Sequence, residues 1–487
     1  MKRIFLAVIF FALIGGSCRD SFLTVVPQNG SITDAEFFQT TEHFDSFIFG
    51  MYTEMQGVAD QISVPGSLMQ DIATDNNQAN LPVFMNPNNG VFYDKFWQVY
   101  FNIAARANLV LEKLPQAPAQ ARDRIEGEAH FMRGFAYFNL ARCFGSVPLL
   151  LESYRPTQDV VGCTPEAEIW NQVVKDLTVA AAKLPTVAGW GANNLGRVTK
   201  GTAFAYLANA QMYLKKWPEA LKATSDLDAL GEFGLMPNVR DPFSRFKENS
   251  KESIFEIQFR EDNNFNWGGN YNKGTLLPKL TAPGDAGREF APGGGWGSFS
   301  FTRKYADSFE PGDARRRELV LMASEKYKGE DMKDTFKMPG VFAEAKNAFS
   351  TKYWRGPQLG PSDLLNPQNV PMMRYAEVLL NHAEILFETG NATLAYEKMN
   401  LVRNRAKLPN RPVSTDREVF FRDLMRERRS ELGMEPNIYF HFVRTQRLAP
   451  FLKSEYNIDF DPNWTRFPIP QRDRNQNPNL CQNPGYR

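Results

Sequence analysis

Few side chains in this chain of 487 residues could do covalent or metal chemistry, since it has only four cysteines and four histidines. Beyond Cys18, three cysteines remain: Cys143, Cys163 and Cys481. Their odd number and the lack of CxxC spacing indicate neither a disulfide framework nor a zinc site. Buried thiols are the expected state, with a Cys143–Cys163 bridge as the alternative in an oxidising compartment. The histidines form no HExxH motif, so we predict no metal, no cofactor and no catalytic residue.

Cys18 stands at the end of a segment typical of exported proteins. Lys2 and Arg3 precede an apolar run over residues 4–14, which is too short to span a bilayer. Small residues then lead directly into Cys18, as in a bacterial lipobox. We therefore predict a lipoprotein signal peptide over residues 1–17 and lipidation of Cys18. Each buried methylene of an acyl chain strengthens membrane attachment by roughly 0.8 kcal/mol.

Aromatic rings offer a third kind of chemistry, the stacking of a ligand on a flat face. Phe, Tyr and Trp make up 13% of the chain. Residues 262–300 hold nine glycines together with Trp267 and Trp296, so this stretch cannot form a regular helix. Long loops within compact proteins are usually functional or disordered. Aromatic residues in this stretch are therefore candidates for ligand contact.

The charge balance argues against nucleic acid or anionic lipid as a partner, because the formal net charge is only +1. Two arginine clusters, at residues 315–317 and 426–429, have acidic neighbours in the sequence. We expect them to lie on solvated or ion-paired helix faces.

Helical periodicity identifies the elements that must carry these loops. From Met372 to Leu386, apolar residues recur every three or four positions, and Gly390 then supplies a left-handed cap. A second helix follows with Ala395, Met399, Val402 and Ala406 on its inner face. Together they form a helical hairpin that cannot bury its apolar face alone.

A related hairpin lies earlier, at residues 205–214 and 219–221 around a turn that contains Trp217 and Pro218. The two hairpins show weak self-similarity of the tetratricopeptide type, with two helices in about 34 residues. Residues 126–144 are apolar on two sides, which predicts a nearly enclosed helix. Glu128 and Arg133 within it are expected to be paired, because an unpaired buried charge costs several kcal/mol.

Recognisable motifs run over nearly the whole length of the chain. One is the block from Gly127 to Leu140, and the others lie at residues 20–23, 97–108, 144–149, 196–201, 374–380, 400–406, 427–432, 467–470 and 477–486. In type and order these motifs resemble those of the SusD/RagB family of Bacteroidetes outer-membrane nutrient-binding lipoproteins, and the 127–140 block is close to the most recognisable motif of that family.

The resemblance implies a mostly α fold, a tetratricopeptide-like superhelix with a loop-rich ligand-binding subdomain. Residues 18–487 would form one SusD/RagB-like domain. Its helical repeats would span about 97–230 and 370–450, around a loop-rich insertion at about 231–369 and before an extended tail at 451–487. It also implies capture of oligosaccharides outside the cell and their delivery to a SusC-like TonB-dependent barrel in the outer membrane, without catalysis.

A sugar-binding surface needs aromatic planes for the C–H faces of the ring and polar groups for its hydroxyls. Our aromatic candidates are Trp296, Trp267, Tyr271, Phe92 and Tyr93. The polar candidates, on two loops expected to converge, are Asp75, Asn76, Asn77, Asn263 and Asn264.

Three alternatives compete with oligosaccharide capture. The first is peptide binding, as in the RagB branch of the family. The second is an envelope scaffold that binds no small ligand. The third is a glycoside hydrolase, which needs two carboxylates about 5–10 Å apart; no pair in the sequence is singled out for that role.

Overall fold

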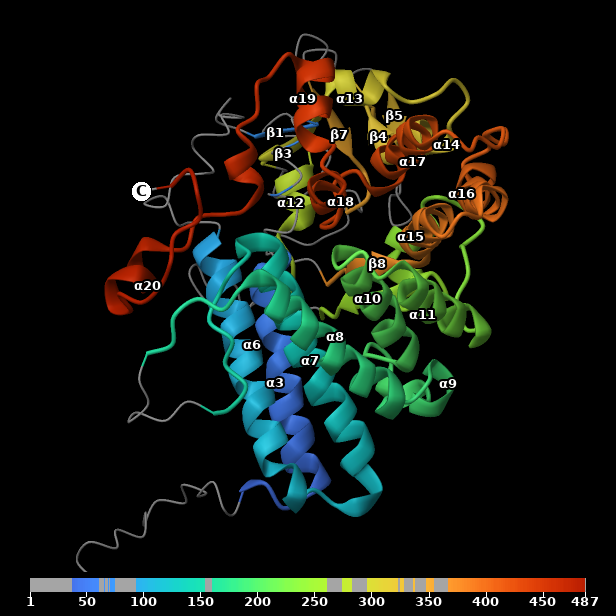
Figure 1. Cartoon of the computed structure of the whole chain (residues 1–487). Coiled ribbons are helices and arrows are strands. Elements are labelled where there is room, and N and C mark those ends of the chain that lie inside the picture. The colour runs from blue at the N-terminus through green and yellow to red at the C-terminus, as the bar shows by residue number, and fades with distance from the viewer. Residues whose placement is uncertain are drawn as a thin grey trace, which may run out of the picture.

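The structure is a computed structural model of the whole chain, shown in Figure 1. It describes residues 37–60, 65, 69, 71–74, 93–153, 160–260, 274–282, 296–322, 325–327, 336–337, 347–353 and 367–486. The described chain is mostly helical, as the sequence predicts. The predicted signal peptide and Cys18 lie outside the described residues.

Six long helices between residues 41 and 229 pack side by side, and each contacts the next along the chain (Figure 1). They are α3 (Thr41–Ala59), α6 (Tyr93–Lys113), α7 (Ala119–Phe144), α8 (Glu166–Lys183), α10 (Lys200–Tyr213) and α11 (Trp217–Ala229). Short turns join them: η2 (Leu114–Gln116), α9 (Val187–Trp190) and η3 (Ala192–Asn194). Sequence periodicity missed α3, which begins well before the predicted start of the repeats.

The predicted hairpin of α10 and α11 is confirmed, and local sequence explains its ends. Thr199 and Thr202 form a reciprocal capping box at the start of α10. Lys215 turns the chain with a left-handed φ of 54°. Pro218 then occupies the first turn of α11, where its missing N–H leaves no helical hydrogen bond unmade.

Helix α7 is enclosed along most of its length, as its two apolar sides predict. Glu128 and Arg133 are both buried and both paired, although not with each other. Arg133 donates to the carboxylate of Asp176 on α8 at 2.7 and 3.0 Å. Glu128 accepts from Arg197. Both ion pairs therefore tie α7 to a neighbouring segment, as the cost of an unpaired buried charge requires.

The second hairpin consists of α15 (Tyr375–Glu388) and α16 (Ala392–Arg405), and Gly390 between them has a φ of 88°. Its first helix begins at Tyr375 instead of Met372. Residues 370–374 form a strand, β8 (Val370–Arg374), which pairs antiparallel with β2 (Ser253–Ile257). Helices α17 (Arg417–Leu432) and α18 (Ile438–Arg444) follow.

Residues 231–369, predicted as loop-rich, also contain short elements in the described parts. A four-stranded sheet has the order β1-β3-β7-β4, and β5 pairs with β6. The strands are β1 (Ile72–Thr74), β3 (Phe299–Thr302), β4 (Val320–Leu321), β5 (Lys326–Tyr327), β6 (Phe336–Lys337) and β7 (Asn347–Ser350). The helical turns are η4 (Asp241–Phe243), η5 (Arg245–Lys247), α12 (Leu277–Thr281), α13 (Arg303–Asp307) and α14 (Ala314–Leu319).

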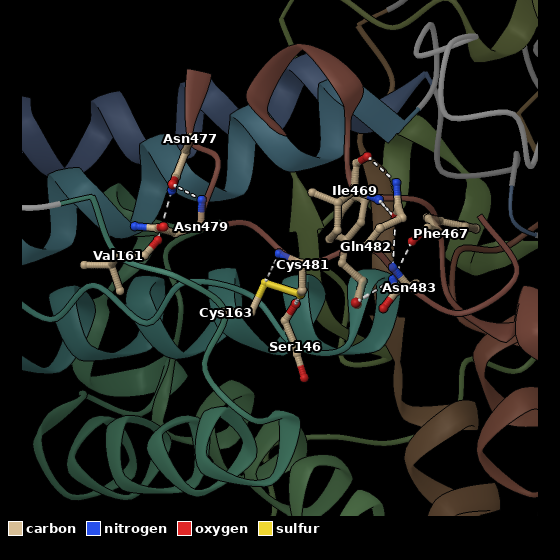
Figure 2. Close-up of a disulfide and its surroundings, with 11 residues drawn as sticks. Ser146, Val161, Cys163, Phe467, Ile469, Asn477, Asn479, Cys481, Gln482 and Asn483 are labelled. Atoms are coloured by element: carbon tan, nitrogen blue, oxygen red, sulfur yellow. Dashed lines mark hydrogen bonds between the residues drawn. A yellow bond between two sulfur atoms is a disulfide. The ribbon is translucent and has the colours of Figure 1, made fainter. Parts of the chain in front are cut away.

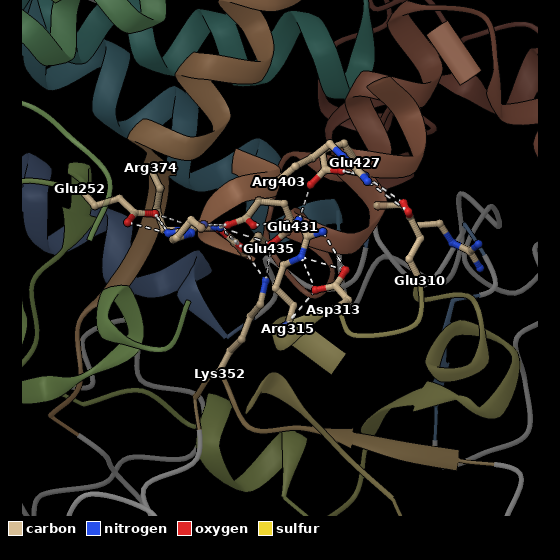
Figure 3. Close-up of polar contacts among 12 residues, drawn as sticks. Glu252, Glu310, Asp313, Arg315, Lys352, Arg374, Arg403, Glu427, Glu431 and Glu435 are labelled. Carbon is tan, nitrogen blue, oxygen red and sulfur yellow. Dashed lines mark hydrogen bonds and ion pairs between the residues drawn. The ribbon is translucent and has the colours of Figure 1, made fainter. Parts of the chain in front are cut away.

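A buried network of ion pairs joins this region to α16 and α17 (Figure 3). Arg315 lies 2.6 Å from Glu427 and 3.2 Å from Glu431. Arg374 lies 2.6 Å from Glu252 and also contacts Glu431. Acidic and basic members alternate, so each buried charge has an opposite neighbour. The remaining members are Glu310, Asp313, Lys352, Arg403, Arg405, Arg411 and Glu435.

The predicted extended tail contains two helices, since α19 (Leu448–Tyr456) and α20 (Gln471–Gln476) lie in it together with the turn η8 (Pro462–Thr465). A disulfide between Cys163 and Cys481 fastens its end to the segment before α8 (Figure 2). The expectation of buried free thiols is therefore wrong for these two residues, as is the alternative Cys143–Cys163 bridge. Cys143 is free and buried. Sequence spacing could not show a pairing across 318 residues.

Among the described residues, no helix combines the length and apolar character that crossing a membrane requires.

Candidate ligand-binding site

The register of β1 and β3 brings together two segments that flank predicted site residues. Thr74, which directly precedes Asp75, is paired with Phe299. Phe299 lies three residues after Trp296. The end of β1 at Thr74 and the segment of Trp296 that precedes Phe299 therefore lie at the same end of one antiparallel ladder.

Trp296 is held by its backbone against α12. Its N–H donates to the carbonyl oxygen of Lys279 at 2.7 Å, and the N–H of Gly297 donates to Ala282 at 2.9 Å. The Trp296 side chain is half-buried. These hydrogen bonds fix the backbone from which the ring projects, so ligand contact there would cost little backbone freedom.

Asp60 ties α12 to the end of α3. Its carboxylate accepts from the hydroxyl of Thr275 at 2.6 Å and from the N–H of Leu276 at 2.7 Å. These donors precede α12, so Asp60 serves the unpaired N–H groups of that helix terminus. Burial raises the pKa of Asp60 to about 6. The support under Trp296 thus extends into the helical repeats.

A second anchor holds the start of β1. The carboxylate of Asp71 accepts two hydrogen bonds from Arg429 of α17, at 2.9 and 2.7 Å. The hydroxyl of Tyr456, at the end of α19, donates to the same carboxylate at 2.6 Å. Sequence reasoning missed these anchors because Asp71 lies 358 residues from Arg429. The acidic neighbours of the 426–429 cluster did predict ion pairing, which holds for Arg429.

Of the predicted site residues, the structure describes two. Trp296 has intermediate exposure, and its role as a ligand contact stays a prediction. Tyr93 is only 2% exposed at the start of α6, with its ring centroid 5.8 Å from that of Phe467, so we place it in the core. The others lie outside the described residues: Trp267, Tyr271, Phe92, Asp75, Asn76, Asn77, Asn263 and Asn264.

Two buried carboxyl groups have strongly raised pKa values, but both serve the fold. Asp60 caps α12, as described above. Burial raises the pKa of Glu377 to about 7, and its Oε1 lies 2.9 Å from Nε2 of His441 between α15 and α18. Glu377 is 2% exposed, so it faces the protein interior. Among the described residues, no group of acidic, histidine or cysteine side chains could hold a metal ion.

Comparison with known proteins identifies the fold and the family. The family described as "Starch-binding associating with outer membrane" matches residues 21–214, and the SusD family matches residues 345–486. A SusD-like protein of Formosa agariphila is 26% identical over an alignment of 534 positions, which covers 99% of each chain.

Solved structures agree with the sequence matches. The surface glycan-binding protein A from Bacteroides fluxus is 25% identical, with a TM-score of 0.74 over 92% of this chain and 100% of that one. A laminarin binding SusD-like protein has a TM-score of 0.77 at 22% identity, over 92% of this chain and 100% of its own. From the ordered motifs, the helical hairpins and these matches, we conclude that the chain belongs to the SusD/RagB family.

Proposed function

We propose that this protein captures oligosaccharides at the cell surface and delivers them to a SusC-like TonB-dependent barrel in the outer membrane. The observation that carries the proposal is the anchored, half-buried Trp296 beside the strand pair that leads into the Asp75 loop. Similar folds named as surface glycan-binding and laminarin binding proteins support the choice of ligand class.

The physical basis is stacking combined with hydrogen bonding. A pyranose ring presents an apolar C–H face that fits the indole plane of Trp296. Base–aromatic stacking, the measured analogue, contributes about 1–3 kcal/mol for each ring. In this proposal Asp75, Asn76 and Asn77 bind the sugar hydroxyls, together with Asn263 and Asn264. Trp267, Tyr271 and Phe92 supply further apolar faces.

Binding of this kind requires no bond cleavage, so we propose a protein without catalytic activity and without a cofactor. The sugar would enter the barrel intact. Among the described residues, Asp60 and Glu377, whose pKa values burial raises to about 6 and about 7, are engaged in hydrogen bonds within the fold. This arrangement supports binding over hydrolysis, which needs a carboxylic acid that reaches the scissile bond.

Attachment to the membrane would come from acylation of Cys18 after removal of residues 1–17. The Cys163–Cys481 disulfide supports location outside the cytoplasm, because disulfides persist in oxidising compartments. The helical repeats would then hold the ligand loops away from the lipid anchor and face the partner barrel.

A glycan array with the mature protein tests the proposal. We expect one class of oligosaccharide to bind, and no new reducing ends after prolonged incubation with it. New reducing ends would indicate a hydrolase. Binding of peptides without binding of any glycan would indicate the RagB-like alternative. Binding of neither glycans nor peptides would favour the envelope scaffold.

A further inference from the structure

A pocket lies between α17, α18 and α19, which are neighbours in Figure 1. Its volume is about 550 Å³, within the range of small-ligand sites. No residue predicted to bind ligand lines this pocket. Arg429 contributes to its wall and also holds Asp71, so the pocket lies beside the strand that leads to the Asp75 loop.

The charge of this pocket is strongly one-sided. Four arginines line it, Arg422, Arg426, Arg429 and Arg447, against a single acidic side chain, Glu455. Two of the arginines are neutralised: Arg429 by Asp71 at 2.7 Å and Arg447 by Glu418 at 2.8 Å. Glu455 lies 3.9 Å from Lys304, which offsets its charge.

The excess positive charge therefore resides on Arg422 and Arg426. They are four residues apart on α17, so both project from the same face, and both are exposed. Within the described part of the chain, the only ion pair of Arg422 is a 3.8 Å contact with Asp423, and Arg426 forms none within 4 Å. Their guanidinium groups are therefore available to an external anion.

The opposite wall of the pocket is apolar and aromatic. The ring of Phe451 is half-buried, and Pro450 beside it is exposed. The buried ring of Phe442 packs against Phe451, with ring centroids 4.8 Å apart. Arg429 lies 5.0 Å from the Phe451 ring. An aromatic side chain thus lies across the pocket from Arg426 and from Arg422, whose only ion pair within the described part of the chain is the 3.8 Å contact with Asp423.

We propose that this pocket binds an anionic sugar unit, with its ring on Phe451 and its carboxylate or sulfate group on Arg422 and Arg426. This proposal deepens and rests on the proposed glycan-binding function. Arginine binds planar or tetrahedral oxyanions through paired N–H donors, and the bonds are stronger than those between neutral groups. A neutral sugar would supply no charge to either guanidinium group, so the pocket should discriminate between acidic and neutral units.

Calorimetry with matched probes tests this pocket. The carboxylate arm uses trigalacturonate and its methyl ester, and the sulfate arm uses a κ-carrageenan tetrasaccharide and its desulfated form. The test variant is Arg422→Gln/Arg426→Gln. Its control, Arg317→Gln/Arg472→Gln, also removes two positive charges, but from exposed side chains outside this pocket. A second variant, Ser454→Trp, fills the pocket at an exposed position and leaves its charges intact.

We expect the wild type to prefer the charged probe at least tenfold in one arm, and that arm identifies the anion. The preference should disappear in Arg422→Gln/Arg426→Gln, fall in Ser454→Trp and persist in the control. The proposal would be overturned if neither arm showed a preference for the charged probe. It would also be overturned if the preference survived in Arg422→Gln/Arg426→Gln. The binding of a neutral glycan to the wild type and to Trp296→Ala tests the proposed function separately. A failure of the pocket can therefore be distinguished from a failure of the proposed function.

Discussion

The guanidinium of Arg429 on α17 donates two hydrogen bonds to the carboxylate of Asp71, at 2.9 and 2.7 Å, across 358 residues of sequence. Tyr456 adds a third hydrogen bond to the same carboxylate. The segment that enters β1 is thereby fastened to two C-terminal helices. Buried charges in the scaffold thus hold the segment that directly precedes the predicted polar residues Asp75, Asn76 and Asn77.

Asp71→Asn removes the charge and keeps the shape of this anchor. Because Arg429 would remain buried without a counter-charge, we expect the free energy of unfolding to fall by about 3 kcal/mol. Asp459→Asn is the control, because Asp459 is exposed and pairs with Lys453 on the surface. The control should change stability by less than about 0.5 kcal/mol. Equal effects in urea unfolding would show that the anchor contributes nothing special.

Two arginines two residues apart offer a matched test of the buried network. The Arg315 side chain is 1% exposed and contacts three acidic residues, whereas that of Arg317 is 80% exposed beside Glu318. Arg315→Gln leaves the buried carboxylate of Asp313 without its cation and removes one of the partners of Glu427 and Glu431. We therefore expect a loss of about 3–5 kcal/mol. Arg317→Gln should cost less than about 1 kcal/mol. The melting temperatures of the two variants measure the difference, and similar values would contradict the role of the network.

Sequence reasoning succeeded where the signal is local. The hairpins around Lys215 and Gly390 were predictable because periodicity and turn residues lie within about 30 positions. Periodicity predicts helix from Met372, whereas residues 372–374 belong to β8, because the partner strand β2 lies more than 110 residues away. Tyr93 shows a second limit, since a pattern of residue types cannot tell which side of a helix start faces the core. The Cys163–Cys481 bridge likewise depends on tertiary structure alone.

The buried pair of Glu377 and His441 predicts a specific pH dependence. Burial raises the pKa of Glu377 to about 7 and lowers that of His441 well below 6.5. The folded pair therefore holds one proton, on Glu377. The unfolded pair also holds one between about pH 4.5 and 6.5, on the histidine. The pair should thus leave the free energy of unfolding unchanged in this window. It should lower that free energy as the pH falls below 4.5, and lower it slightly as the pH rises from 6.5 to 7.

Glu377→Gln exposes the contribution of His441 alone. The pKa of His441 is depressed in the folded state, so only the unfolded state takes up a proton as the pH falls through 6.5. The variant should then lose about 1.4 kcal/mol for each pH unit below 6.5, relative to the wild type. Urea unfolding of both proteins at several pH values measures this difference. A difference that stays constant from pH 6.5 to 5 would contradict the assignment.

The Cys163–Cys481 disulfide closes a loop of more than 300 residues, so its removal should destabilise the fold by about 2–5 kcal/mol. We expect reduction to lower the melting temperature of the wild type and of Cys143→Ser, because Cys143 is a free thiol. Cys163→Ser/Cys481→Ser should melt low with or without reductant. A wild type insensitive to reductant would show that the bridge contributes no stability.

The most direct test of the account is calorimetric titration of Trp296→Ala with the oligosaccharide that binds best on the array. Trp217→Ala is the control, because Trp217 is also half-buried but lies at the start of α11. The loss of about 1–3 kcal/mol of stacking predicts that Kd rises roughly 5- to 150-fold in Trp296→Ala. It should stay unchanged in Trp217→Ala. Wild-type affinity in Trp296→Ala would contradict the proposed site.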